Sequence, residues 1–216
     1  MTCSTHCEGV EEVFARRTAR RELKRYRRRG PRRSTLLLLE ALGADTAAGG
    51  TLLDVGGGIG VIQHELLARG FSRAVHVDGS SAYLSASREE AARRGTGDRV
   101  QYHHGDVVEL APGLPAADVV TLDRVICCYP DLERLVAATA PKARRLYGLV
   151  YPRERWATRA GVALENLWLR VRGSAFRAYV HPEAAIDGAV RSHGLRRRSE
   201  RSLLLWRVAI YEREPD

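Results

Sequence analysis

Short apolar runs alternate with amphipathic stretches along most of the chain. Five runs have the length and apolar character of buried β-strands: residues 51–55, 73–78, 100–104, 118–122 and 145–150. Three stretches between them have helical periodicity: residues 61–68, 81–94 and 130–140. Because strands and helices alternate in this way, the pattern predicts a mostly parallel sheet covered by helices.

Both ends of the chain add elements to this sheet. At the N-terminal end the pattern predicts a helix over residues 10–29 and a second helix that Ser34 or Thr35 caps and that runs to Leu42. At the other end it predicts helices over 155–172 and 182–194 and strands over 195–202 and 203–212. The last two strands form a hairpin. The expected fold is therefore α/β, a Rossmann-like seven-stranded, mostly parallel sheet with one antiparallel strand and helices on both faces.

The first strand ends in a glycine-rich turn at the start of a helix. Asp54 is followed at alternate positions by Gly56, Gly58 and Gly60. Glycines permit a tight turn and a close approach of the backbone to a ligand. The following helix offers free N–H groups and a partial positive charge at its start. The turn is therefore a candidate cradle for a nucleotide-like or anionic ligand.

The spacing of these glycines excludes two families of nucleotide-binding turn. A dinucleotide-binding turn has the pattern G-x-G-x-x-G, but its third position is Val61 or Gln63 in the two possible registers. A phosphate-binding loop ending in Gly-Lys-Ser/Thr is absent, since no lysine lies between Lys24 and Lys142. The pattern Asp-x-Gly-x-Gly-x-Gly instead resembles the first motif of the class I S-adenosylmethionine-dependent methyltransferases.

Two further strand ends extend this resemblance. Asp78, Gly79 and Ser80 close the second strand, and a carboxylate there can accept two hydrogen bonds from a ribose diol. Asp106 and Val107 close the third strand. The resemblance implies that S-adenosyl-L-methionine is the cofactor. It also implies these roles: Asp54 orients the glycine turn and the cofactor's amino group, Asp78 holds the ribose, and Asp106 and Val107 contact the adenine.

The segment after the fourth strand is expected beside the transferable methyl group. Amino-group methylases carry Asn/Asp-Pro-Pro-Tyr/Phe there, whereas this chain has Asp123 followed by Arg-Val-Ile, which counts against that class. Methyl transfer from a sulfonium is an in-line displacement that alignment and desolvation can drive. A base is needed only where the acceptor must lose a proton. The candidate catalytic residues are Asp123, Tyr129 and His181.

The N-terminal segment carries the whole excess of positive charge. The chain has a formal net charge of +9, and residues 14–33 hold eleven Arg or Lys and one Glu. A basic arm suggests nucleic acid or another anionic surface, and a solvated helix face in an arginine-rich chain is the plainer explanation. Around Tyr26 and Gly30 the segment loosely resembles the magnesium-protoporphyrin and ubiquinone-type O-methyltransferase branches. That resemblance implies that Tyr26, or an arginine among 27–29, reaches the cofactor carboxylate.

The cysteines leave two alternatives open. Cys3, His6 and Cys7 form only half of a zinc-binding pattern, so structural or unstructured cysteine is favoured and no metal site is predicted.

The sequence has no apolar run near ~20 residues and no signal-peptide core, so we expect a cytoplasmic protein without a membrane span.

These observations lead to one expected function and two alternatives. We expect residues 1–44 to form a basic helical lid over a methyltransferase domain at 45–216. The expected activity is transfer of a methyl group from S-adenosylmethionine to a small-molecule acceptor, most simply at oxygen. The alternatives are a nucleic-acid or protein methyltransferase that uses the basic arm, and a protein that binds the cofactor without catalysis. The oligomeric state does not follow from the sequence.

Overall fold

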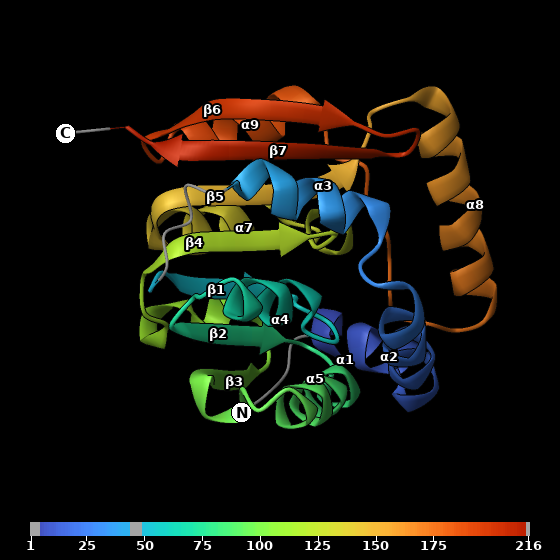
Figure 1. Ribbon diagram of the computed structural model, residues 1–216. Coiled ribbons are helices and arrows are strands. Elements are labelled where there is room, and N and C mark those ends of the chain that lie inside the picture. The colour runs from blue at the N-terminus through green and yellow to red at the C-terminus, as the bar shows by residue number, and fades with distance from the viewer. Residues whose placement is uncertain (1–4, 44–48, 215–216) are drawn as a thin grey trace.

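The computed structural model describes residues 5–43 and 49–214 and contains one seven-stranded sheet (Figure 1). Its order is β3-β2-β1-β4-β5-β7-β6, and β7 runs antiparallel to both of its neighbours. This confirms the predicted α/β sheet with one antiparallel strand. The strands are β1 (Thr51–Val55), β2 (Arg73–Asp78), β3 (Val100–His104), β4 (Ala117–Asp123), β5 (Ala143–Pro152), β6 (Leu195–Ser202) and β7 (Trp206–Arg213).

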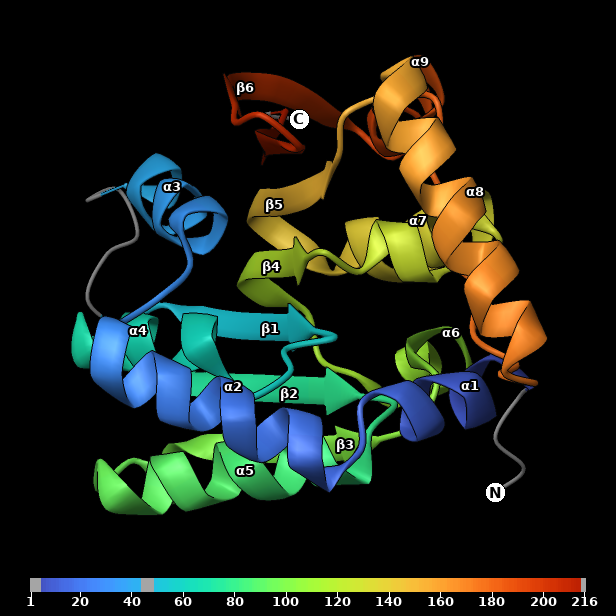
Figure 2. The ribbon, with the colours of Figure 1, turned by 90° about the vertical axis from the view of Figure 1, so that its right-hand side faces the viewer.

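Helices cover both faces of the sheet (Figure 2). One apolar cluster joins α3 and α4 to one face, and another joins α6, α7 and α9 to the other face. The α-helices are α1 (Thr5–Val13), α2 (Arg16–Arg29), α3 (Arg33–Leu42), α4 (Val61–Ala68), α5 (Ser81–Arg93), α6 (Val107–Leu110), α7 (Leu132–Thr139), α8 (Trp156–Val171) and α9 (Glu183–Arg191). Because both faces are covered, the central strands are buried along most of their length.

The predicted helix over residues 10–29 is broken into α1 and α2. The break lies at Phe14 and Ala15, where Ala15 adopts an extended backbone before α2. Phe14 packs between Tyr83 and Phe176, at ring-centroid distances of 5.4 and 5.6 Å. These contacts come from distant parts of the chain, so the local pattern, which is helical on both sides, did not reveal the break.

The third helix belongs to the sheet layers. Leu38, Leu39 and Leu42 of α3 are fully buried in the core. Arg32, and not Ser34 or Thr35, occupies the N-cap position of this helix. The Thr35 hydroxyl instead donates a hydrogen bond to Asp123. We therefore place the end of the covering segment before α3, earlier than the boundary at residue 44 that the sequence suggested.

The longest helix, α8, packs loosely against the rest of the molecule. Of its 16 residues only Leu169 is buried. It lies on the side of the sheet toward which the parallel strands point, the same side as α1 and α2 (Figures 1 and 2). Within residues 5–43 and 49–214, no helix is long and apolar enough to cross a membrane.

Candidate functional site

A cavity of about 470 Å³ lies at the carboxyl ends of β1, β2 and β4. Ligands bind at this edge in open parallel sheets. The cavity wall brings together most of the residues that the sequence singled out: Asp54, Gly56, Gly58, Asp78, Gly79, Asp106, Val107, Asp123 and Tyr129. The three acidic strand ends and the glycine turn therefore share one space.

The glycine turn needs glycine at its three predicted positions for conformational reasons. Gly56, Gly58 and Gly60 have φ angles of 58°, 58° and 78°, in the left-handed region that side chains disfavour. Gly60 and Ser80 do not line the cavity themselves. The Ser80 hydroxyl donates to the Phe14 carbonyl at 2.7 Å and so ties α5 to the chain between α1 and α2.

A fourth glycine, Gly57, is needed for space, and sequence reasoning missed it. A Cβ on Gly57 would lie 2.6 Å from Asp54 Oδ2 and 2.8 Å from His76 Nε2. Both atoms are buried without a hydrogen-bond partner. His76 is the neighbour of Asp54 in the β1–β2 register, so the crowding arises across two strands. The only signal in the sequence is that the variable position of the motif is also glycine.

Asp54 sits at the base of the turn. Its Oδ1 accepts a hydrogen bond from the Thr121 hydroxyl at 2.7 Å, while Oδ2 faces the backbone of Gly57. Burial, assisted by the charges of Asp123 and Asp78, raises the pKa of Asp54 to about 7. An unpartnered buried oxygen beneath a glycine cradle fits a ligand that approaches the backbone closely.

Asp78 links the second strand to the glycine turn. Its Oδ2 accepts from the Gly58 N–H at 2.8 Å, and its Oδ1 accepts from the Ser80 N–H at 2.7 Å. Burial raises the pKa of Asp78 to about 6, although these two hydrogen bonds oppose the rise. A carboxylate held by both oxygens at the cavity wall is suited to a ribose diol.

This arrangement predicts that cofactor affinity depends on pH. The diol needs the ionised form of Asp78, so affinity is full well above pH 6, is about half at pH 6 and is lost as the pH falls further. With a pKa of about 6, binding at pH 5 should be about tenfold weaker than at pH 7. Calorimetric titration with S-adenosylhomocysteine measures this change. Asp78→Asn should bind weakly at both pH values with a much smaller change, and a wild-type affinity that rises toward pH 5 would contradict the assignment.

Tyr129 and Asp106 form a pair at the adenine side of the expected site. The Tyr129 hydroxyl lies 3.1 Å from both carboxylate oxygens of Asp106, which also accepts from the Val108 N–H at 2.9 Å. Burial and the charge of Asp106 raise the pKa of Tyr129, so the phenol stays protonated.

His181 lies outside the cavity wall, where its Nε2 is 2.9 Å from the Tyr129 carbonyl oxygen. This contact suits a residue that positions the loop.

Asp123 and Arg124 form the wall after β4. The Thr35 hydroxyl donates to Asp123 Oδ2 at 2.5 Å, and Arg124 Nε donates to Oδ1 at 3.1 Å. Arg124 has a φ of 64°, which is uncommon for a residue with a side chain. Its N–H bonds to the Val150 carbonyl at 2.9 Å, and its guanidinium lies 6.0 Å from the Trp206 ring centroid. These contacts hold a cation and a carboxylate side by side at the cavity.

The N-terminal helices roof the cavity. Val10, Val13 and Phe14 line it from above, together with Phe176 from the segment after α8. Glu11 accepts a hydrogen bond from the Ser81 N–H at 2.8 Å and so holds α1 against α5. The roof therefore joins the start of the chain to a segment that follows α8.

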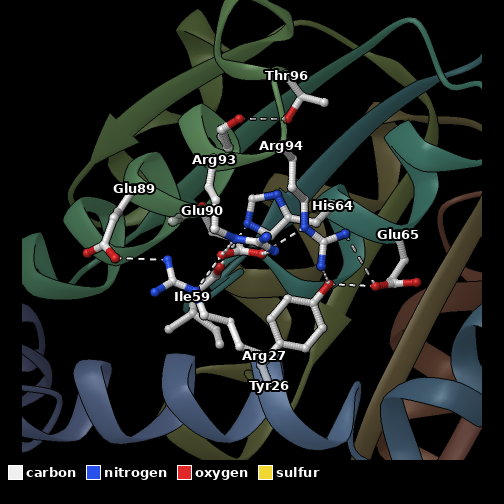
Figure 3. A network of polar contacts seen from close by, with 12 residues as sticks. Tyr26, Arg27, Ile59, His64, Glu65, Glu89, Glu90, Arg93, Arg94 and Thr96 are labelled. Carbon is white, nitrogen blue, oxygen red and sulfur yellow. Dashed lines mark hydrogen bonds and ion pairs between the residues drawn. The ribbon is translucent and has the colours of Figure 1, made fainter.

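Tyr26 does not reach the cavity, in contrast to the expectation from sequence. It points toward α4 and α5, where its hydroxyl donates to Glu65 at 2.5 Å and accepts from Arg94 at 2.8 Å (Figure 3). Arg27 faces the same way and pairs with Glu89 and Glu90, each at 2.8 Å. The phase of α2 explains the difference, since Tyr26 lies on the buried side of the helix together with Ala19 and Leu23 and packs toward α5.

A different arginine of α2 lines the cavity. Arg25 lies in the wall, and so does Arg32 from the chain just before α3. Arg25 donates to the Gly30 carbonyl at 3.0 Å, whereas Arg32 pairs with Glu22. Burial and the nearby positive charge of Arg32 lower the pKa of Arg25. The crowding of positive charge there favours an anionic group.

The cysteines offer no metal site among the described residues. Cys127 and Cys128 line the cavity with their sulfur atoms 3.8 Å apart. In residues 5–43 and 49–214, no group of three or more His, Cys, Asp or Glu side chains is placed to hold a metal ion. Cys3 lies outside the described residues, and so do the side chains of His6 and Cys7.

Comparison with known proteins finds a methyltransferase domain in the part of the chain that forms this site. Residues 53–141 match the family model described as a methyltransferase domain. The chain is 31% identical, over 145 residues, to a ribosomal protein L11 methyltransferase of Xylella fastidiosa, covering 62% of this chain and 46% of that protein. It spans about half or less of the length of the curated relatives it matches.

Solved structures share the fold. The structure of magnesium protoporphyrin IX methyltransferase from Synechocystis PCC 6803 with bound SAH superposes with a TM-score of 0.67 at 19% identity, covering 84% of this chain and 82% of that one. An O-methyltransferase family protein from Burkholderia thailandensis gives 0.73 at 21% identity, covering 95% and 61%. Residues 53–141 therefore carry a methyltransferase domain, and the fold is the one shared by these S-adenosylmethionine-dependent methyltransferase structures.

Proposed function

We propose that the protein transfers the methyl group of S-adenosylmethionine to an oxygen atom of a small molecule. The observation that carries the proposal is the cavity under the N-terminal helices. The glycine turn and three acidic strand ends line one part of it, and Arg124, Cys127 and Trp206 line another. When bound, the cofactor supplies an electrophilic methyl group on a sulfonium, so the protein has mainly to align and to exclude water.

The residues of the wall have separate roles in this proposal. Asp78 accepts the ribose hydroxyls, while Val107 and the Asp106–Tyr129 pair bound the adenine. The backbone at Gly57 passes against the methionine part of the cofactor. Arg25 takes the place first expected for Tyr26 and binds the cofactor carboxylate, because a guanidinium suits a carboxylate. These roles give a contact to each of four parts of the cofactor: the adenine, the ribose, the methionine chain and its carboxylate.

The role of Arg25 can be tested by comparing two ligands. Arg25→Gln should weaken S-adenosylhomocysteine binding by about 10- to 100-fold, the worth of a hydrogen bond to a charged group. It should leave the affinity for 5′-methylthioadenosine, which lacks the carboxylate, almost unchanged. Arg28→Gln on the exposed side of the same helix is the matched control. Equal losses for both ligands in Arg25→Gln would contradict the assignment.

The acceptor is proposed to bind beyond Asp123. Arg124, Cys127 and Trp206 line the cavity there, and Glu165 of α8 adds a carboxylate. In this proposal Asp123 accepts the proton of an acceptor hydroxyl, because it lines the cavity and the hydrogen bonds from Thr35 and Arg124 fix the position of its carboxylate. The roof covers part of this space, which favours a small acceptor over a polymer. His181 keeps a positioning role through the Tyr129 carbonyl.

A panel of acceptors tests this proposal. The protein is incubated with methyl-labelled S-adenosylmethionine and phenols, carboxylic acids, amines, thiols, ribosomal protein or RNA. We expect S-adenosylhomocysteine to form with an oxygen acceptor and to decrease strongly in Asp123→Asn. Label in amines or thiols alone would contradict the choice of oxygen. Tight binding without turnover on any acceptor would indicate a cofactor-binding protein and contradict catalysis.

A macromolecular acceptor is the second candidate. One curated relative is named as a ribosomal protein L11 methyltransferase, and residues 14–33 carry a concentrated positive charge. Label in ribosomal protein or in RNA, but in none of the small molecules, would favour this candidate. The two candidates share the cofactor site and differ only in what reaches the Asp123 side of the cavity.

A further inference from the structure

The outward face of α8 carries a row of exposed apolar side chains. We call this set the α8 face, and its members are Trp156, Leu164, Leu167, Trp168 and Val171. Trp156 and Val171 are 84% and 80% exposed. Four of the five recur at helical spacing, so they point to one side of the helix. Contiguous exposed apolar surface of this kind marks an interaction site.

The turn between β6 and β7 lies at the start of α8. Leu204 and Leu205 in this turn are 77% and 54% exposed. The Arg153 N–H, three residues before α8 begins, donates to the Leu205 carbonyl at 2.9 Å. Exposed apolar residues therefore come from two parts of the chain that meet at the N-terminal end of α8.

Basic residues flank the α8 face. Arg155, Arg159, Arg170 and Arg172 are exposed on α8 and at its two ends. Arg159 pairs with Glu154 at 2.6 Å, and the Arg172 guanidinium lies 4.1 Å from the Trp168 ring centroid. The basic helix α2 occupies the same side of the molecule (Figures 1 and 2). Its exposed basic residues are Arg16, Arg17, Arg20, Arg21, Lys24, Arg27, Arg28 and Arg29.

We propose that the α8 face docks on an anionic lipid surface. Helices that lie in the membrane interface carry Trp and Leu on one side and Arg or Lys beside them, as α8 does. Tryptophan prefers the headgroup level, and each basic residue near an anionic leaflet adds attraction. Docking in this way brings the cavity, whose wall includes Glu165 of the same helix, close to the bilayer.

The charge of this surface favours lipid over the other occupants. A two-fold dimer would set the same patch against itself and bring like-charged arginines together. Nucleic acid would use the arginines and could stack on tryptophan, but the leucines and the valine give it no stacking platform. An anionic bilayer surface matches both the charge and the aliphatic side chains.

Vesicle binding by the full chain tests the proposal. Mixed phosphatidylglycerol and phosphatidylcholine vesicles should co-sediment the protein, salt should weaken the binding, and pure phosphatidylcholine should bind it far less. Tryptophan fluorescence should shift to the blue on binding, since two of the three tryptophans lie on the α8 face. Wild-type protein that does not co-sediment with anionic vesicles would overturn the proposal.

A matched pair of variants locates the binding surface. Leu164→Glu with Leu167→Glu should lower vesicle affinity by about tenfold or more, because charge replaces apolar insertion. Ser85→Glu with Ala137→Glu adds the same charge at exposed positions of α5 and α7 and should reduce affinity much less. Unchanged S-adenosylhomocysteine affinity in both variants shows an intact fold and separates docking from cofactor binding.

Three other results would contradict lipid docking. An equal loss of vesicle affinity in the two double variants would show that only the overall charge of the protein matters. A wild-type dimer that Leu164→Glu with Leu167→Glu dissociates, seen by analytical ultracentrifugation, would assign the α8 face to a second copy of the chain. Salt-sensitive RNA binding without vesicle binding would assign this side of the molecule to nucleic acid.

Discussion

Gly57→Ala is expected to weaken cofactor binding severely, although it adds only a methyl group. Its Cβ would lie 2.6 Å from Asp54 Oδ2 and 2.8 Å from His76 Nε2, inside a region where neither strand can easily move. The turn must therefore shift away from its present path. Overpacking of this kind costs about 1–3 kcal/mol of folding stability. We expect S-adenosylhomocysteine affinity to fall by about 100-fold or more, or ~2.7 kcal/mol.

Calorimetric titration and thermal unfolding together measure this effect. Gly188→Ala is the matched control, because a Cβ there meets nothing within 4 Å and helix α9 should gain slightly from alanine. The control should bind the cofactor like the wild type and unfold at the same or a higher temperature. A Gly57→Ala protein with wild-type affinity would show that the turn does not contact the cofactor.

Glu90→Gln is expected to destabilise the fold strongly, although Glu90 lies outside the cavity. The Glu90 side chain is fully buried and binds Arg27, Arg93 and Arg94 at 2.8, 2.5 and 2.8 Å (Figure 3). Removing one partner of a buried ion pair costs about 3–5 kcal/mol. Since these arginines are partly exposed, water offsets some of this cost, and we expect a loss of about 2–3 kcal/mol in the free energy of unfolding.

The neighbouring carboxylate provides the control. Glu89 is exposed and pairs with Arg27 at 2.8 Å, so Glu89→Gln should cost less than about 1 kcal/mol. Denaturant unfolding measures both variants. Similar small losses for the two would show that the buried carboxylate does not hold α2 on α5.

The same network predicts a loss of stability in acid. Burial raises the pKa of Glu90, but hydrogen bonds from Arg93, Arg94 and Arg27 outweigh burial and hold that pKa well below its usual range. A lowered carboxylate pKa stabilises the fold above the ordinary pKa of glutamate, near 4.3, and this stabilisation is lost as the pH falls further. The difference in unfolding free energy between wild type and Glu90→Gln should therefore shrink below about pH 4. A constant difference down to pH 3 would contradict this origin.

Local signals explain what the sequence predicted correctly. The central strands are short apolar runs, and the acidic residues at their ends are adjacent in sequence to those runs. The topology of a parallel sheet then brings Asp54, Asp78 and Asp106 to one edge. The glycine turn is likewise contained in one stretch of chain, so its position and its family resemblance required no tertiary information.

The features that the sequence did not reveal depend on contacts between distant segments. Gly57 is constrained by His76 on the neighbouring strand, and the break before α2 by Phe14 packing on Tyr83 and Phe176. The phase of an arginine-rich helix decides that Arg25 faces the cavity while Tyr26 faces α5. Basic residues occur on all sides of this helix, so its sequence does not predict which of them faces the cavity.

Binding of S-adenosylmethionine to the full chain, measured by calorimetry, is the most direct test of the account. We predict one site per chain near neutral pH, strongly weakened in Asp78→Asn and Gly57→Ala and retained in Gly188→Ala. Competition by S-adenosylhomocysteine should be complete, since both ligands use the same turn and the same carboxylate. A folded wild-type protein that binds neither ligand at millimolar concentration, or an Asp78→Asn protein that binds as tightly as the wild type, would contradict it.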